Sequence, residues 1–238
     1  MLSTYSTADE IQDSGVDLAL LPIGSTEQHG SHLPLATDYI IAAALGEKVA
    51  EKLGAFLLPA MPISTCREHM GKKGSIWINP DTFFHMMRDI VMSLKEQGFK
   101  RVVILQAHGG IFMLTPIVRE LNAVNADIKV IRVDLSQFSQ TKEMEEILEC
   151  RNNLHACESE TSLMLYLNEE FVRKDRIMDW LPNVPRDYLN YASIFKYSSI
   201  GVWGMPSLAT AEKGEKILNI LTEKCVEYVN NVEKLFDK

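Results

Sequence analysis

The chain has 238 residues, of which 46% are hydrophobic and 24% are charged. Such a composition suits a globular protein with a buried core and excludes a disordered or collagen-like chain. The net charge is −8 and no block of basic residues is present. Because nucleic acids and anionic membranes are bound by neutralising phosphate charge, we expect neither as a partner and expect small-molecule ligands instead.

The N-terminal residues 1–13 lack the basic start and apolar run of a secretory signal. Apolar stretches elsewhere are interrupted by charges before they reach the roughly 20 residues that cross a bilayer. The four cysteines form no CxxC pair and no close cluster, which favours free thiols over a disulfide framework or a structural zinc site. These features predict a cytoplasmic protein with no membrane span.

Short apolar segments alternate with helical patterns along the first 134 residues. Strands are predicted over residues 17–23, 55–61, 101–107 and 128–134, and helices over 38–54, 80–97 and 116–124. Further on, the sequence predicts an acidic helix over 143–150, a helix beginning near Glu158, a loop over 180–197 and an amphipathic helix over 210–236. The alternation predicts a single α/β domain over residues 1–238, with a mostly parallel sheet flanked by helices on both faces.

Histidines and carboxylates follow these strands directly, where parallel sheets place their ligands. Glu27 and His29 come after the first strand, Asp38 begins the next helix, and His108 follows the third strand. Imidazole and carboxylate donors together suit Zn, Mn or Fe. Taken singly, a loop histidine is more often a solvated side chain, and Asp38 suits a helix N-cap. Their arrival at the same end of the sheet favours a metal site.

A second cluster, HACESETS, precedes and begins a predicted helix. His155 lies just outside this helix, and Glu158 and Glu160 lie in its first turn, where carboxylates also offset the positive end of the helix dipole. A histidine near a metal can transfer a proton near neutral pH. Cys157 is a weaker alternative as a nucleophile, because nothing but its neighbours suggests a lowered thiol pKa.

The loop after the second predicted strand supplies candidate substrate contacts. Glu68, His69 and Ser75 lie in this loop. A solvated surface loop with two lysines is an equally good explanation of the same residues.

Four motifs in this order, PIGSTEQHGSHLPLATD, HGG, HACESETS and GVWGMPSLATAEKGE, resemble the creatininase (creatinine amidohydrolase) family. The resemblance runs from about Leu21 to Lys216. It implies a parallel α/β fold, a two-metal centre at the strand ends and assembly as a hexamer. The family includes creatinine amidohydrolase, a formamide deformylase of archaeal flavin biosynthesis and a peptidase that matures a redox cofactor.

The same resemblance implies roles for individual residues. Glu27 and His108 would bind one divalent ion, His29 would bind the other, and Asp38 would bridge them. His155 would be the proton shuttle.

The chain departs from the family pattern at three places. Some members carry a Glu two residues after the third-motif histidine, where this chain has Gly110, so Glu160 is expected to complete the second metal site, with Glu158 as the reserve. Gln106 and Ile111 replace two asparagines around HGG, and Cys157 replaces a glycine. These departures point away from creatinine itself as the substrate.

The resemblance therefore implies an amidohydrolase with two divalent metal ions per subunit, Zn, Mn or Fe, in a homo-oligomer. We expect it to cleave a C–N bond in a small or cyclic non-peptide amide by a metal-bound hydroxide, with His155 and Glu160 as catalytic residues. A formamide deformylase or peptidase at the same site, and a metal-binding scaffold without catalysis, are the alternatives.

Overall fold

A four-stranded parallel sheet forms the centre of the structure, a computed structural model that describes residues 1–236. The last two residues of the predicted domain, 237 and 238, lie outside the described residues. In spatial order the strands are β2 (Phe56–Leu57), β1 (Leu18–Ile23), β3 (Arg101–Gln106) and β4 (Lys129–Asp134). β1 pairs with β3 from Leu18 opposite Arg101 to Ile23 opposite Gln106, so both strands end at the same level.

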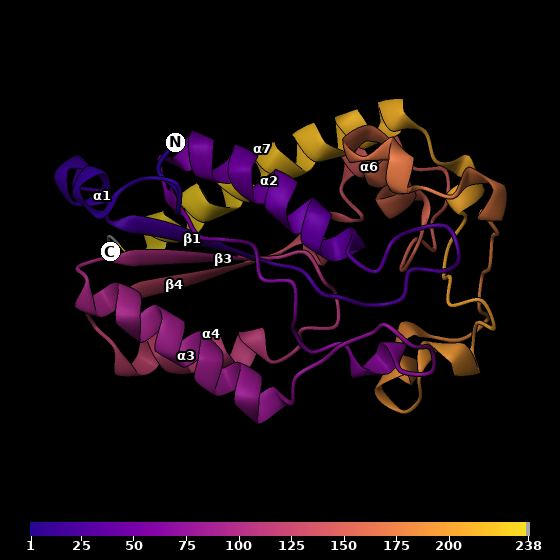
Figure 1. The fold of residues 1–238 in the computed structure, drawn as a ribbon, viewed down its shortest axis with the longest axis horizontal. Coiled ribbons are helices and arrows are strands. Elements are labelled where there is room, and N and C mark those ends of the chain that lie inside the picture. The colour runs from indigo at the N-terminus through magenta and orange to yellow at the C-terminus, as the bar shows by residue number, and fades with distance from the viewer. Residues whose placement is uncertain (237–238) are drawn as a thin grey trace.

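Helices cover both faces of the sheet and make three layers (Figure 1). One face carries α2 (Thr37–Leu53), α6 (Glu158–Leu167) and α7 (Ala211–Phe236), and the other carries α3 (Pro80–Glu96) and α4 (Leu114–Val124). Successive residues of β1 point to opposite faces, so Leu18 and Leu20 join one core and Ala19 and Leu21 the other. The predicted parallel sheet between helical layers is confirmed.

The predicted second strand is shorter than expected. β2 contains only Phe56 and Leu57, although the N–H groups of Leu58 and Met61 still donate to carbonyls of β1. The acceptors Leu20 and Pro22 are two residues apart, whereas the donors Leu58 and Met61 are three apart, so one extra residue interrupts the regular ladder.

Two helices differ from the prediction. A short helix α1 (Ala8–Ser14) occupies the N-terminal segment, and it begins with a capping box between Thr7 and Glu10. The predicted acidic helix shortens to α5 (Lys142–Glu145). The N–H groups of Glu149 and Cys150 donate to the carboxylate of Glu158 instead of helical carbonyls, so the helix cannot continue there.

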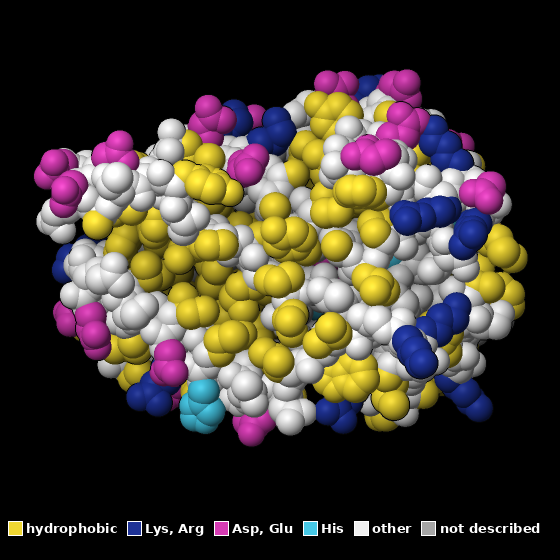
Figure 2. All heavy atoms as spheres, in the orientation of Figure 1, with side chains coloured by type: hydrophobic (Ala, Val, Ile, Leu, Met, Phe, Trp, Pro, Cys, Tyr) yellow, Lys and Arg dark blue, Asp and Glu magenta, His cyan; other side chains and the backbone are white. Residues whose placement is uncertain are grey.

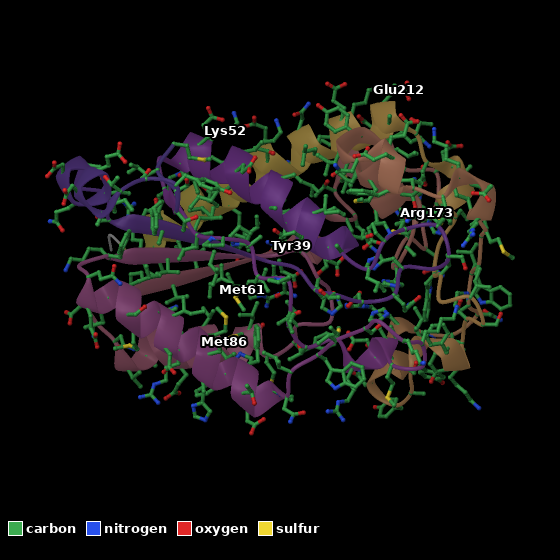
Figure 3. The ribbon with its side chains drawn as sticks, in the orientation of Figure 1. Tyr39, Lys52, Met61, Met86, Arg173 and Glu212 are labelled. Atoms are coloured by element: carbon green, nitrogen blue, oxygen red, sulfur yellow. The ribbon has the colours of Figure 1, made fainter. Side chains whose placement is uncertain are left out.

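Hydrophobic side chains gather on the surface between α2 and α3, above the β2 edge of the sheet (Figure 2). In the same orientation Tyr39, Met61 and Met86 lie in this region (Figure 3), and we call these three residues the β2-edge patch. Within residues 1–236, every helix is too short or too polar to cross a bilayer.

Candidate active site

Side chains from four parts of the fold meet where β1 and β3 end. Glu27 and His29 lie in the loop after β1, Asp38 lies in the first turn of α2, His108 follows β3, and Glu160 lies in the first turn of α6. The first four are at most 4% exposed. The structure thus brings together all five residues that the sequence proposes as metal ligands.

These residues form two adjoining groups that could each hold a cation. In the first group, His108 Nδ1 lies 3.2 Å from Glu27 Oε2 and 3.1 Å from Asp38 Oδ2. In the second, His29 Nε2 lies 3.1 Å from Asp38 Oδ1 and 3.9 Å from Glu160 Oε1. Asp38 belongs to both groups and presents one oxygen to each, which is the arrangement of a bridging carboxylate.

Several polar atoms of these groups are buried without a hydrogen bond of good geometry. They include both carboxylate oxygens of Glu27 and Nε2 of His29, even though neighbouring ligand atoms are only 3.1–3.3 Å away. A buried carboxylate left in this state costs several kcal/mol unless it is paired. Lone pairs that converge without bonding to one another fit a divalent cation between them.

Without a cation, protons carry the positive charge of this site. Burial lowers the pKa of His29, but the neighbouring Asp38 carboxylate outweighs burial and raises that pKa to about 10. Burial opposes ionisation of Asp38 too, yet His29 and His108 hold its pKa well below the usual range. Burial, with the charge of Asp38 adding, raises the pKa of Glu27 to about 7. Cations entering the site would displace these protons.

Two further histidines lie beside these two groups, and one of them, His155, forms a third potential cation group with Glu27 and His29. The ring of His155 lies 4.3 Å from that of His29 and 4.1 Å from that of His69. Burial, with nearby imidazolium charge adding, lowers the pKa of both His69 and His155 well below the ordinary value, so both rings are neutral.

Gln28 sets the tautomer of these two rings. Its main-chain carbonyl accepts a hydrogen bond of 2.7 Å from His155 Nε2, which leaves His155 Nδ1 unprotonated and 3.7 Å from Glu27 Oε1. Its side-chain amide Nε2 donates a hydrogen bond of 3.1 Å to His69 Nδ1, which leaves the ring proton of His69 on Nε2. His69 Nε2–H therefore faces Glu27 Oε1 at 3.3 Å. Gln28 is not among the residues predicted from the sequence, although its place between Glu27 and His29 was an available signal.

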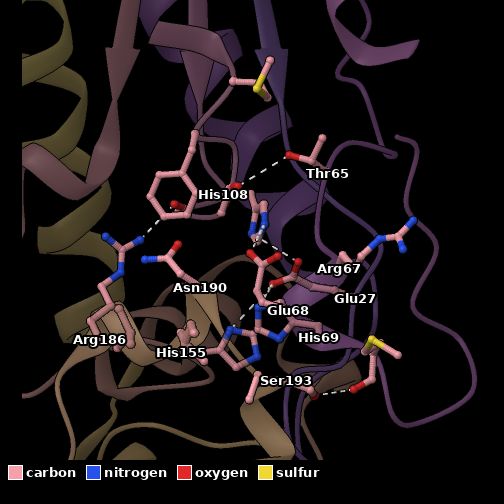
Figure 4. A pocket seen from close by; sticks show the side chains of 18 of the residues that line it. Glu27, Thr65, Arg67, Glu68, His69, His108, His155, Arg186, Asn190 and Ser193 are labelled. Atoms are coloured by element: carbon pink, nitrogen blue, oxygen red, sulfur yellow. Dashed lines mark hydrogen bonds and ion pairs between the residues drawn. The ribbon is translucent and has the colours of Figure 1, made fainter. Parts of the chain in front are cut away.

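A cavity of about 590 Å³ opens onto the site (Figure 4). Glu68 and His69, two of the three predicted substrate contacts, line it together with Glu27, His108 and His155.

The third predicted contact has a different environment. Ser75 Oγ accepts a hydrogen bond of 3.0 Å from the Gln28 N–H, and Ser75 does not line the cavity that opens onto the site.

Of the two glutamates in the first turn of α6, only Glu160 points toward the cation groups. Glu158 is fully buried and accepts a hydrogen bond of 2.6 Å from Lys213 Nζ, so it stabilises the packing of α6 and α7. The alternative in which Cys157 is a nucleophile has no support, because burial raises its thiol pKa well above the ordinary value.

A second cavity of about 570 Å³ adjoins the first, and both are lined by Gly109, Leu154, Glu160 and Arg186. Arg186 Nη2 donates a hydrogen bond of 2.9 Å to the carbonyl of Gly109. The predicted loop over 180–197 thus supplies the positively charged guanidinium of Arg186 at the junction of the two cavities. Arg186 is not among the residues predicted from the sequence.

A parallel sheet with candidate cation groups at its strand ends defines an α/β protein with a candidate metal centre. The chain belongs to the creatininase family, because it matches the family model described as "Creatininase: Creatinine amidohydrolase" over residues 3–229. The resemblance proposed from the sequence is confirmed.

Individual relatives differ in activity. The chain is similar to the mycofactocin precursor peptide peptidase of Mycobacterium ulcerans, with 30% identity over 88% of this chain and 83% of the relative. Similarity to creatinine amidohydrolase of Pseudomonas putida is 26% identity over 88% of this chain and 87% of that protein. The crystal structure of creatinine amidohydrolase (creatininase) matches with a TM-score of 0.83 and 23% identity over 97% of each chain. Other matching creatininase structures are described as "Zn-Zn type" and "Creatininase Mn".

Proposed function

We propose that this protein hydrolyses the C–N bond of a small or cyclic non-peptide amide at a pair of divalent cations. The main observation in support of this proposal is that two groups of ligand atoms share Asp38 and open onto one cavity. Membership of the creatininase family supports amide hydrolysis.

The donor atoms fit two divalent ions in this site. Glu27, Asp38 and His108 would hold one ion, and His29, Asp38 and Glu160 the other. Imidazole and carboxylate donors suit Zn, Mn or Fe, and the Zn and Mn creatininase structures support two of these choices. When bound, such cations lower the pKa of water that they polarise and withdraw charge from an amide carbonyl oxygen.

The contacts of His155 support a role in proton transfer at this site. Its Nε2–H is held by the Gln28 carbonyl, so the lone pair of Nδ1 is free and faces Glu27 at the cavity wall. Nδ1 can take a proton from the attacking water and return it to the departing nitrogen. Because burial holds the ring neutral, its Nδ1 lone pair is available near pH 7.

Replacement of this histidine tests the proposal. We expect His155→Ala to lower kcat by 10²- to 10⁴-fold, the usual contribution of a general acid–base, while two cations per chain remain bound. Elemental analysis and kinetics on a panel of cyclic amides, formamides and short peptides, after loading with Zn, Mn or Fe, provide the measurement. Wild-type protein that holds cations but turns over nothing on the panel would support the scaffold alternative.

A peptide is the second candidate substrate, and two observations favour it. The relative from Mycobacterium ulcerans is a peptidase, and two cavities of similar volume meet at Glu160. An extended substrate could lie on both sides of the cleaved bond. Higher kcat/KM on peptides than on cyclic amides in the same panel would select this candidate.

We also propose that the chain forms a homo-oligomer in the cytoplasm. In the β2-edge patch Tyr39 is 37% exposed, and Met61 and Met86 are partly exposed. Apolar surface of this kind commonly marks protein interfaces, which supports self-association. Light scattering of the purified protein measures the subunit number, and a monomer would contradict the proposal.

A further inference from the structure

His108 lies between carboxylates on both sides of its ring. Nδ1 faces Glu27 and Asp38 in the first cation group. On the opposite side, Nε2 lies 3.3 Å from Glu68 Oε1, a charge contact without the geometry of a hydrogen bond. The ring therefore separates Glu68 from the two carboxylates that would share the cation.

Glu68 occupies space that exists only because residue 110 is a glycine. A Cβ at Gly110 would lie 1.7 Å from Glu68 Oε1 and 2.4 Å from His108 Nε2. Gly110 is not among the glycines with positive φ, so its backbone does not demand glycine. The missing side chain instead makes room for the Glu68 carboxylate against the imidazole.

The segment that carries Glu68 is anchored independently of His108. Glu68 lies in the 3-10 turn η1 (Arg67–His69). Arg67 Nη2 donates a hydrogen bond of 2.9 Å to Asn79 Oδ1, and the His69 N–H donates to the Cys66 carbonyl. Glu68 is only 17% exposed, so the turn delivers a carboxylate to a fixed place beside the ring (Figure 4).

We propose that Glu68 is a positioning residue that holds His108 in the orientation and tautomer needed to bind a cation through Nδ1. A neutral imidazole carries one proton, and a carboxylate beside Nε2 keeps that proton on Nε2. The lone pair then lies on Nδ1, toward Glu27 and Asp38. The inference rests on the proposed function only in requiring that a cation binds this group.

Neither of the other roles for Glu68 agrees as well with this geometry. Glu68 belongs to none of the potential cation groups found in residues 1–236, because the His108 ring stands between. As a substrate contact it would be expected to direct its oxygens into the cavity, whereas Oε1 faces the imidazole.

The test is a metal titration of metal-free protein with Zn²⁺ or Mn²⁺ against a competing chelator. We expect Glu68→Ala to weaken binding 10- to 100-fold, the usual effect of removing the carboxylate partner of a ligating histidine. Glu68→Gln should weaken it less, since the partial negative charge of an amide oxygen can still face Nε2–H. The matched control is Asp187→Ala, which removes another carboxylate from the same cavity and should bind as the wild type does.

A spectroscopic readout separates positioning from general stabilisation. In ¹⁵N spectra of the Zn²⁺-loaded protein, Glu68→Ala should alter the tautomer signal of His108, while circular dichroism shows an intact fold. Metal affinity within twofold of the wild type for both Glu68 variants would overturn the inference, as would an equal loss in Asp187→Ala. A raised KM with unchanged metal affinity would make Glu68 a substrate contact instead. Failure of the wild type to bind any cation would overturn the proposed function itself.

Discussion

His32 is a buried histidine of the loop after β1 that lies outside the cation groups. Its Nε2 lies 3.0 Å from Thr161 Oγ1 of α6, and within residues 1–236 no polar atom pairs with its Nδ1. Burial, with the positive charge of His29 adding, lowers the pKa of His32 to about 4. The folded protein therefore holds this side chain neutral and ties the loop to α6 through it.

We predict that His32 makes the folded state sensitive to acid. Its folded pKa lies below the ordinary value of 6.5, so its contribution is fully present above pH 6.5 and is lost as pH falls toward 4. Between pH 7.5 and pH 4.5 the loss is about 2–3 kcal/mol. Denaturant unfolding at both pH values should show a smaller loss for His32→Gln than for the wild type.

An exposed histidine provides the control for this measurement. His85→Gln, on α3, should keep the pH dependence of the wild type. Equal slopes in the wild type and His32→Gln would mean that His32 is not held neutral.

At the residue scale, the sequence predicted the members of the cation groups but not the side chains that orient them. Glu27, His29 and Asp38 lie in one continuous motif, so their residue types and spacing are visible along the chain. Gln28 and Glu68 act through contacts between loops that are distant in sequence. No local pattern encodes which nitrogen of an imidazole such a contact will protonate.

At the element scale, Asp38 depends on how closely α2 approaches the end of β1. A Cβ at Gly24 would lie 2.5 Å from the backbone carbon of Asp38 and 2.5 Å from the backbone nitrogen of Tyr39. Ser25 Oγ, one residue later, donates a hydrogen bond of 3.0 Å to Asp38 Oδ2. The first turn of α2 therefore rests directly on the backbone that leaves the sheet.

We expect Gly24→Ala to displace the first turn of α2 and with it the bridging carboxylate. Overpacking of this kind typically costs about 1–3 kcal/mol, and cation affinity should fall at least tenfold because Asp38 serves both groups. Chemical denaturation and chelator competition measure the two effects.

Gly54→Ala, at the other end of the same helix, is the matched control. Gly54 has a φ of +64° and open space around its Cβ position, so alanine there should cost about 1 kcal/mol through backbone strain alone. Its cation affinity should be that of the wild type. A loss of affinity equal to that of Gly24→Ala would show that general destabilisation, not the position of Asp38, weakens binding.

The helices were predicted accurately where apolar residues recur at helical spacing over several turns. The prediction failed where tertiary contacts determine where a helix ends. Periodic patterns located α2, α3 and α7. The shortening of α5 is caused by Glu158, whose carboxylate binds N–H groups of residues eight and nine positions earlier in the chain. A local pattern did exist for α1, since Thr7 and Glu10 have capping-box spacing.

At the scale of the whole molecule, strand order creates the site. β1 lies between β2 and β3. The loops that carry Glu27, Glu68 and His108 therefore leave neighbouring strands at their carboxyl ends, on the same side of the sheet. Alternating strands and helices predict a parallel sheet, but they do not fix which strands are neighbours. We could therefore expect the ligands to converge only because parallel sheets generally bind ligands at the carboxyl ends of their strands. The order of the strands in the structure determines which ligands are neighbours.

In this arrangement, bound cations would connect elements that are far apart in the sequence. They would join the loop after β1, the end of β3, α2 and α6 through the buried carboxylates Glu27 and Asp38 and the partly exposed Glu160. Without cations, protons on the imidazoles and on Glu27 compensate the carboxylate charge. Ligands that bind the folded state alone stabilise it in proportion to the logarithm of their concentration.

We therefore predict that removing cations with a chelator lowers the melting temperature, and that adding Zn²⁺ or Mn²⁺ restores it. At a free cation concentration 1,000 times the dissociation constant, one site contributes about 4 kcal/mol. This increment should shrink as pH falls, because protons compete for His29, whose pKa without a cation is raised to about 10. In Asp38→Asn, calorimetry should show almost no response to the same cations. A melting temperature indifferent to saturating cation in the wild type would mean that the buried carboxylates are compensated by protons alone.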